Sequence, residues 1–440
     1  MAIRMAILIC LILMIKSSGI MTNTIPDGYM PQTCETLPGY LSDKLPQDLI
    51  LGGKPETWTV TEVGDGNLNL VFIVSGSERT IIVKQALPYV RAAGESWKLS
   101  INRAFFEYNV LLQENKYAGN ALVPEVYFYD PLMAVFAMEY LAEHIILRKK
   151  LIAGEKQPGL EQEIGYFLAK TLFHTSDIGM DAAEKKALVA NFANNHELCK
   201  ITEDLIFTEP YFDAPRNNWT SPQLDDEVHA LWQDGDVIHI AMKYKYKFMT
   251  EAQALLHGDL HSGSIMVSAT DSKVIDPEFG FMGPMAFDIG NYIGNLYLAY
   301  FAQAGLQPDI QRRQNYQIWL LEQIEQTWAV FESTFRQLWD EKQSGEAYPH
   351  ILYQQHDSAL LQRAQDDFFK TLFEDTLVNA GLEMNRRIIG FAGVADFKTI
   401  ADASLRAQCE RSALKMAREL ITNASAHANF SQLKLYASEC

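Results

Sequence analysis

The sequence contains 440 residues, 48% of them hydrophobic and 21% charged, so the chain can bury a large core and is long enough for two lobes. Its formal net charge of −18 excludes a nucleic-acid partner, because neutralising a phosphate backbone requires a basic surface. The five cysteines lack the spacing of a disulfide framework or a zinc site, which favours a reducing compartment: Cys10, Cys34, Cys199, Cys409 and Cys440.

Residues 1–36 are expected to form an N-terminal extension outside the fold. Within it, Arg4, an apolar run and the segment 16–19 follow the order of a secretory signal, and the run is too short to span a membrane. The polar segment after Met21 is instead typical of a cytosolic start. We favour an upstream translation extension over residues 1–20, a cytoplasmic protein and no stable membrane association; a true signal remains the alternative.

Residues 37–141 predict a small lobe rich in strands. The segments 57–63 and 68–74 alternate like strands, and the turn between them contains Gly64 and Gly66. Two glycines at a hairpin tip let backbone N–H groups approach a phosphate, although two glycines alone are a weak signal.

Lys84 interrupts the next apolar strand, residues 80–86. A lysine on a buried strand is unfavourable unless it is paired, so Lys84 is expected to point into a cleft and meet an acid or a phosphate. Glu107 lies on a following helix with an apolar stripe and is the expected acid. The alternative is a Glu107 that faces solvent.

Two further features complete this lobe. The segment Leu87–Trp97 predicts a long loop, and loops of this length near a cleft often act as mobile lids. The segments 124–129 and 133–141 predict a hairpin whose second strand continues into the connection between lobes. Its exposed backbone, at Glu139, Tyr140 and Leu141, can bind an adenine edge.

Residues 142–430 predict a large, mainly helical lobe, followed by a C-terminal tail at 431–440. Apolar positions recur with helical period in six segments: 159–175, 181–199, 224–256, 315–339, 358–380 and 395–424. The expected fold class is therefore α+β, with a β-rich N-lobe and a helical C-lobe.

The segment 253–291 brings three carboxylates to one point. Two short strands joined by a polar turn predict a hairpin, and Asp259 before it lies at the same end as Asp276 and Glu278 after it. Phosphoryl transfer needs such an arrangement, with one carboxylate for the attacking hydroxyl and others for the magnesium that neutralises the phosphates. His257 and His261 are expected to brace the Asp259 loop. The alternative is a surface hairpin with scattered acids.

These motifs, in this order, resemble the protein-kinase-like fold of the small-molecule kinases, which includes aminoglycoside and choline phosphotransferases. Within that group the sequence is similar to the methylthioribose kinase family. Three features carry this similarity: Ser264 where aminoglycoside-type enzymes usually have Asn, the Asp276-Pro277-Glu278 motif, and the segment 384–390 with Arg386 and Arg387. The resemblance covers roughly residues 40–424.

The resemblance implies transfer of the ATP γ-phosphoryl group to the 1-hydroxyl of 5-methylthioribose, in methionine salvage, by a homodimer. It implies Asp259 as the base, Asp276 and Glu278 as Mg²⁺ ligands, and a substrate site at Asp259, Arg386, Arg387 and the Trp97 loop. The implied nucleotide-binding residues are Gly64, Gly66, Asn69, Lys84, Glu107, Glu139, Tyr140, Leu141, Asp276, Pro277 and Glu278. Another small-molecule phosphotransferase of this fold, and a nucleotide-binding pseudokinase, remain alternatives.

Two geometric expectations accompany this resemblance. Period-2 spacing would put Asp276 and Glu278 on one side if the backbone between them is extended. Arg386 and Arg387 are adjacent on a predicted helix and would point about 100° apart, so that one reaches the γ-phosphate while the other holds a sugar hydroxyl or braces the loop. Without the family resemblance, the sequence favours two surface arginines near a helix end.

Overall fold

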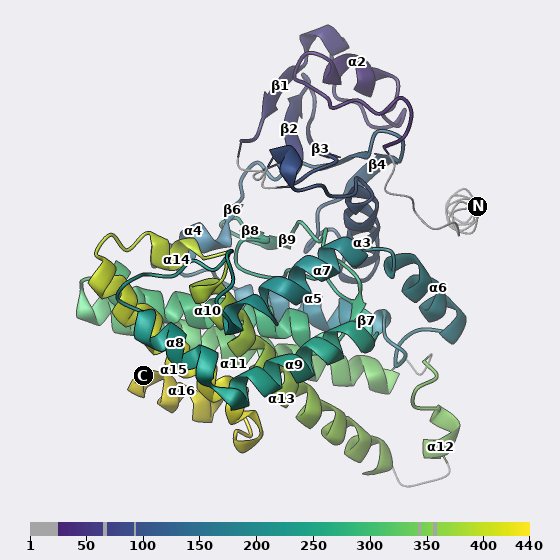
Figure 1. Ribbon diagram of the computed structural model, residues 1–440. Helices are drawn as coiled ribbons and strands as arrows, with labels where there is room; N and C mark the ends of the chain where they lie inside the picture. The colour runs from purple at the N-terminus through teal and green to yellow at the C-terminus, as the bar shows by residue number, and fades with distance from the viewer. Residues whose placement is uncertain (1–24, 65–67, 92–93, 342–344, 355–358) are drawn as a thin grey trace.

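The computed structural model describes residues 25–64, 68–91, 94–341, 345–354 and 359–440. A small lobe built on an antiparallel sheet stands on a large helical lobe (Figure 1). The α+β, protein-kinase-like bilobal class expected from the sequence is confirmed. Across the described ranges, no helix has both the length and the apolar character needed to cross a membrane.

The sheet of the small lobe has the order β1-β2-β3-β5-β4, with neighbouring strands antiparallel. Its strands are β1 (Thr59–Glu62), β2 (Asn69–Ser75), β3 (Thr80–Ala86), β4 (Val126–Asp130) and β5 (Val135–Glu139). Side chains alternate along β3, so Ile81 and Val83 pack under the short helix α2 (Leu37–Ser42). Lys84 consequently faces the other side, toward α3 (Arg103–Ala118).

Residues 25–36 were expected to lie outside the fold, and the structure corrects this for that segment. The backbone N–H of Gln32 donates to the side-chain oxygen of Gln85 on β3 at 2.7 Å. The hydroxyl of Tyr29 donates to the carbonyl of Ala86 at 2.8 Å. The small lobe therefore begins before Leu37, while the apolar start at 1–20 lies outside the described residues.

The large lobe contains more helices than the periodic segments predicted. The segment 181–199 divides into two helices, and the segment 224–256 divides at Asp234, whose carboxylate caps the helix that follows it. The helices that run from the small lobe to this point are α4 (Leu147–Ile152), α5 (Leu160–His174), α6 (Ala182–Phe192), α7 (His196–Leu205), α8 (Asp225–Gln233) and α9 (Gly235–Thr250).

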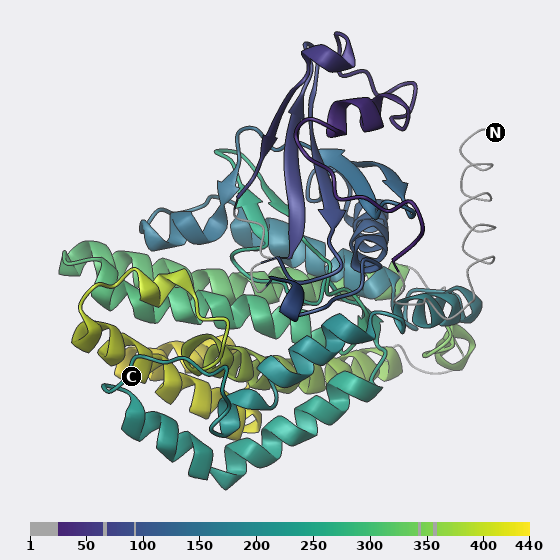
Figure 2. The same cartoon turned by 45° about the horizontal axis from the view of Figure 1, so that its top comes forward.

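The second half of this lobe is organised around a helix that periodicity did not predict. The helix α10 (Met285–Leu306) is buried from Met285 to Gln303 and packs against α11 (Ile310–Glu341), α13 (Ala359–Ile389) and α15 (Ala403–Thr422), as the stacked layers in Figure 2 show. The remaining helices are α12 (His350–Gln354), α14 (Ala395–Lys398) and α16 (Phe430–Glu439). The last of these covers the segment expected as a tail, and its Phe430 and Leu433 are buried.

Short strands present the site loops to the small lobe. The predicted hairpin consists of β8 (Ile265–Val267) and β9 (Ser272–Val274), extended by β6 (Ile145–Ile146). A second pair joins β7 (Ala254–Leu255) to β10 (Met282–Gly283). In Figure 1 the β6-β8-β9 sheet lies at the top of the helical lobe, below the five-stranded sheet. The loops before β8 and after β9 therefore lie between the two lobes.

Candidate active site

The loop that carries Asp259, called here the catalytic loop (residues 257–264), is fixed from below by α10. The carboxylate of Asp288 accepts hydrogen bonds from the backbone N–H groups of His257, at 2.7 Å, and Gly258, at 3.0 Å. Gly258 has φ +84°, and a Cβ there would lie 2.2 Å from the carbonyl oxygen of Phe279. Only glycine allows this approach. The catalytic loop thus contacts the loop after β9, called here the metal loop (residues 276–280).

The two histidines of the catalytic loop brace it, as expected from the sequence. His257 Nε2 lies 2.8 Å from the carbonyl oxygen of Ile275. His261 Nδ1 lies 3.2 Å from the Ser264 hydroxyl, which donates to the carbonyl of Asp259 at 2.6 Å. Ser264 therefore supports the Asp259 backbone. His261 Nε2 lies 3.3 Å from Asp259 Oδ2.

Arg386 and Arg387, at the end of α13, both reach Asp259. Their Nη2 atoms lie 3.6 Å and 3.3 Å from Asp259 Oδ1. The two side chains are only 7% and 6% exposed, so they are not surface arginines. Glu383, one turn earlier, lies 3.6 Å from Arg386 Nε and 2.5 Å from Arg387 Nε. This shared partner turns both guanidinium groups toward one carboxylate, which the expected 100° separation did not foresee.

The charges around Asp259 keep it ionised. Partial burial would raise the pKa of Asp259, but His261, Arg386 and Arg387 outweigh burial and hold that pKa well below its usual range. Burial lowers the pKa of His261 to about 4, so its ring is neutral at pH 7. At that pH the two arginines therefore supply the positive charge that keeps Asp259 a carboxylate.

Lys84 crosses from the small lobe to the metal loop. The ion pair expected between Lys84 and Glu107 on α3 is present, and Lys84 Nζ also lies 2.5 Å from Asp276 Oδ1. Burial would lower the pKa of Lys84, but the carboxylates of Asp276 and Glu107 outweigh burial and raise it. Lys84 therefore stays cationic between two acids. These acids provide the pairing that a lysine on a buried strand requires.

The metal loop does not have the extended backbone that was expected. Asp276 has φ +64°, a left-handed conformation, so the period-2 argument for placing Asp276 and Glu278 on one side is wrong. Both carboxylates nevertheless face the small lobe, on either side of Pro277. Asp276 contacts Lys84, and Glu278 Oε2 accepts a hydrogen bond from the Asn69 amide at 2.9 Å. Asn69, expected at the nucleotide, here contacts the metal loop.

The remaining expected nucleotide-binding residues lie along the edge of the small lobe. Gly64 is exposed beside the hairpin tip, and Gly66 falls outside the described residues. β5 ends at Glu139, whose carboxylate pairs with Lys273 of β9 at 2.7 Å and whose N–H donates to the carbonyl of Glu125, just before β4, at 2.8 Å. The partly exposed Tyr140 and the buried Leu141 follow and begin the connection between the lobes.

Trp97 reaches the large lobe from the loop after β3. Its ring centroid lies 6.1 Å from that of Phe391, which follows α13. The Arg216 guanidinium lies 5.1 Å from the centroid of the Trp97 ring. A short 3-10 helix, Gly94–Ser96, and a bridge from Tyr89 to Lys98 give the end of this segment regular structure. The Trp97 loop therefore contacts the large lobe at the segment that follows α13.

Sequence reasoning missed several residues that hold this site, all buried except Arg148, which is partly buried: Arg103, Arg148, Asn195, Asp288 and Glu383. Arg103, Arg148, Asn195 and Asp288 pair with residues far away in the sequence, so no local spacing marks them, whereas Glu383 also pairs with Arg386 and Arg387 at i+3 and i+4. The Arg148 guanidinium, for example, donates to the Ser262 hydroxyl at 3.0 Å and to the Asn295 amide oxygen at 2.9 Å. For the four charged residues among them, the available signal was their place in a helix, because a helix that buries most of its own surface must pair any charge it carries.

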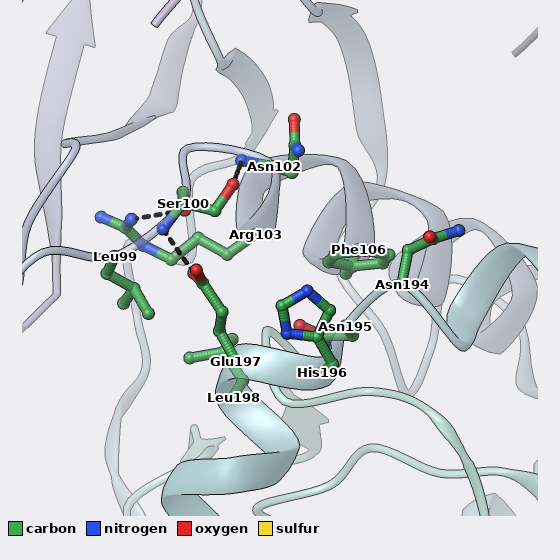
Figure 3. Close-up of a pocket in the computed structure, with 10 residues that line it drawn as sticks. All are labelled: Leu99, Ser100, Asn102, Arg103, Phe106, Asn194, Asn195, His196, Glu197 and Leu198. Carbon is green, nitrogen blue, oxygen red and sulfur yellow. Dashed lines mark hydrogen bonds between the residues drawn. The ribbon is translucent and has the colours of Figure 1, made fainter. Parts of the chain in front are cut away.

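A cavity of about 80 Å³ lies where the two lobes meet, between the start of α3 and the start of α7. Figure 3 shows Glu197 reaching across to the backbone N–H of Ser100, a hydrogen bond of 2.7 Å, beside the Arg103 side chain. Asp276 and Glu278 lie next to this junction as a pair of acids. Within the described ranges, no group of three His, Cys, Asp or Glu side chains has metal-binding geometry.

Taken together, the cleft holds an ionised carboxylate, Asp259, with two arginines beside one of its oxygens. Opposite to it a buried lysine, Lys84, meets two further acids of the metal loop and α3. Such a site can orient a hydroxyl through the carboxylate and attract a polyanion through the cations. Both actions suit transfer of a phosphoryl group.

Comparison with known proteins gives consistent matches. The model of a family described as the phosphotransferase enzyme family matches residues 59–343. A methylthioribose kinase of Escherichia coli is 68% identical over 409 residues, which are 93% of this chain and 97% of that protein. Methylthioribose kinase 1 of Oryza sativa subsp. japonica is 42% identical over 397 residues, 90% and 92% of the two chains.

Solved structures with a similar arrangement of elements are more distant in sequence. A choline kinase from Cryptosporidium parvum matches with a TM-score of 0.43 and 12% identity, over 92% of this chain and all (100%) of that one.

Proposed function

Because this chain belongs to the phosphotransferase enzyme family and, within it, to the methylthioribose kinases, we propose that it transfers the γ-phosphoryl group of ATP to the 1-hydroxyl of 5-methylthioribose. The product is 5-methylthioribose 1-phosphate, in methionine salvage. The observation that carries the proposal is 68% identity along nearly the whole of both chains. The carboxylate of Asp259 between two arginines supports it independently.

Asp259 is the base in this reaction. Its carboxylate accepts a hydrogen bond from the 1-hydroxyl of the sugar and holds the oxygen in line with the γ-phosphorus. It takes the proton as the new O–P bond forms, while the bond from the γ-phosphorus to the β–γ bridging oxygen breaks and ADP leaves. Arg386 and Arg387 lie beside Asp259, where their guanidinium groups can contact the transferring phosphoryl group and the sugar. Arginine suits this position because its planar fork can hold two acceptors at once.

Lys84, fixed by Glu107, binds the ATP phosphates, and the hairpin with Gly64 and Gly66 covers them. Glu139, Tyr140 and Leu141 offer backbone groups to the adenine. Trp97 closes the sugar side of the cleft, where it lies against Phe391. These roles come from the family resemblance and, for the residues that the structure describes, from their location where the lobes meet.

Mg²⁺ fits the acids of the metal loop. Glu107, Asp276 and Glu278 surround a single lysine, and Glu107 Oε2 is buried without a hydrogen-bond partner among the described residues. Asp276 and Glu278 would hold the ion, and oxygen ligands are those that Mg²⁺ prefers. When bound, the ion neutralises charge on the β- and γ-phosphates. Pro277 keeps the two carboxylates apart.

The test is a panel of acceptors with labelled ATP: methylthioribose, choline, glucosamine and an aminoglycoside. We expect label transfer to methylthioribose with kcat/KM at least about a thousandfold above that for the other acceptors. Transfer to another acceptor at a comparable rate would replace this function with the broader one. ATP binding without transfer to any acceptor would indicate a pseudokinase.

The family resemblance also supports a cytoplasmic homodimer. Light scattering coupled to gel filtration gives the molar mass directly, and a value of one chain would exclude the dimer. The proposed division into an extension, a nucleotide-binding lobe to residue 141 and a helical lobe from 142 predicts that limited proteolysis first cuts in the extension or at the junction of the two lobes.

A further inference from the structure

Arg103, at the start of α3, is the most completely bonded arginine near the cleft. It is 2% exposed. Its Nε donates to Asn69 Oδ1 at 2.8 Å, and its Nη2 donates to the carbonyl of Leu68 at 2.8 Å. Its Nη1 donates to the carbonyls of Leu87, at 2.6 Å, and Ser100, at 2.9 Å. A buried guanidinium is unfavourable unless its donors are satisfied, and here they are all directed at one corner of the small lobe.

This bonding fixes which way the Asn69 amide points. Because Arg103 can only donate, the oxygen of Asn69 must face it, and the amide NH₂ must then face the other way. On that side the NH₂ donates to Glu278 Oε2 at 2.9 Å. Arg103 Nε itself lies 4.0 Å from the same oxygen. One carboxylate oxygen of the metal loop is thus held by a hydrogen bond and by a positive charge.

The backbone of Glu278 is held separately, from the large lobe. Asn195, next to the start of α7, is buried, and its amide donates to the carbonyls of Glu278 at 3.0 Å and Gly280 at 2.9 Å. Figure 3 shows Asn195 and Arg103 on opposite walls of the cavity between the lobes. The other carboxylate oxygen, Glu278 Oε1, accepts no hydrogen bond from the part of the chain that the structure describes. It is the oxygen left for a ligand.

We propose that Arg103 is a positioning residue that, through Asn69, aims the Glu278 carboxylate at the divalent cation bound with the nucleotide. The proposal rests on the function proposed above. It adds that the small lobe supplies the support of a ligand that the large lobe carries, so that cation binding and closure of the lobes favour each other. Partners that orient a ligand in this way commonly change metal affinity by about 10- to 100-fold.

The sharpest test is Asn69→Asp. Aspartate keeps an oxygen acceptor for Arg103, so the bonds of that corner remain, but it replaces the donor that faces Glu278 with a second negative oxygen. Asn102→Asp is the matched control, because it makes the same chemical change next to Arg103 in the chain, at a residue that lines the cavity and has no hydrogen bond to Glu278 among the described residues (Figure 3). Arg103→Lys keeps the charge and loses the fork.

The measurement is calorimetric titration of each protein with ADP, once with Mg²⁺ and once with a chelator. For Asn69→Asp we expect the gain in ADP affinity that Mg²⁺ gives to fall about tenfold or more, with metal-free affinity within about threefold of the original. Arg103→Lys should lose part of that gain, and Asn102→Asp should keep it. The Mg²⁺ concentration for half-maximal turnover should rise most in Asn69→Asp, less in Arg103→Lys and not in Asn102→Asp.

An Mg²⁺ response in Asn69→Asp equal to that of Asn102→Asp would overturn the proposal. So would an equal loss of ADP affinity with and without the metal, since that indicates a structural role only. If Asn69→Asp does not fold, as judged by circular dichroism, Arg103→Lys decides alone. No acceptor is present in the titration, so failure to phosphorylate methylthioribose would refute the proposed function without affecting this result.

Discussion

At the scale of single residues, the same two arginines that keep Asp259 ionised also make it a weak base. A carboxylate with a low pKa orients a hydroxyl well but removes its proton late, as the bond to phosphorus forms. This matches a phosphoryl transfer in which the enzyme mainly positions groups and balances charge. We therefore expect a change at Asp259 to affect turnover far more than the fold or ATP affinity.

Replacing Asp259 with Asn should lower turnover by at least about 100-fold, because the amide cannot take the proton. The fold and ATP affinity should change little, since the catalytic loop is held by Asp288 and Ser264. Steady-state kinetics and nucleotide titration measure both. Turnover within about threefold of the original would remove Asp259 from the role of base.

Replacing Arg386 or Arg387 with Lys should lower turnover on methylthioribose more than tenfold in at least one of the two variants, about 1.4 kcal/mol of barrier. An arginine that contacts the transferring group stabilises the transition state more than the bound substrates, so nucleotide affinity should change much less. Both lysine variants are compared by kcat and by ADP titration. Normal kcat in both would mean that the pair only shapes the pocket.

The pH dependence of turnover tests the charge argument. With the pKa of Asp259 lowered, the original protein should show no loss of kcat from this group down to about pH 5. Arg387→Gln removes a positive charge, so the pKa of Asp259 should rise and the acid limb should move to higher pH. Arg387→Lys keeps the charge and should leave the limb in place. Coincident limbs in the Gln and Lys variants would contradict the assignment.

At the scale of elements, α13 combines packing in the large lobe with the two arginines beside Asp259. Its last turns carry Glu383, which is fully buried and holds both arginines. Glu383→Gln leaves two buried guanidinium groups with less compensation and should destabilise the fold by about 3–5 kcal/mol. Glu332→Gln on α11 breaks an i,i+4 pair with Arg336 that is partly exposed, and should cost below about 1 kcal/mol. Urea unfolding compares them; equal losses would show that burial does not matter here.

The elements also show how far sequence reasoning reached. Strands with clear alternation and helices with one apolar stripe, such as α5, were predicted within a few residues. The helix α10 was not, because a helix that is buried on all sides has no stripe. The apolar period of α13 ended at residue 380, nine residues before the helix does, for the opposite reason: polar residues beyond it are buried against one another. The motif residues were found, but their left-handed or paired conformations depend on contacts far away in the sequence.

At the scale of the whole molecule, the described N-terminal segment closes one face of the small lobe. A chain that begins at Leu37 would lose the N–H of Gln32 and the carbonyl of Met30, and so leave the buried amide of Gln85 without two of its partners. We expect a loss of about 1–3 kcal/mol relative to a chain that begins at Met21. The Met21 chain should keep full activity. Equal unfolding midpoints for the two chains would show that residues before 37 are dispensable.

The contact of Gly258 with the carbonyl of Phe279 has a consequence for any motion of the lobes. Two backbones that touch keep a constant separation, whatever side chains surround them. Opening of the small lobe can therefore move Lys84 and Asn69 away, while the distance between the loop that carries Asp259 and the metal loop stays unchanged. An acceptor that binds first would therefore meet a site whose large-lobe part is already formed. Nucleotide binding would then complete the site from the small lobe.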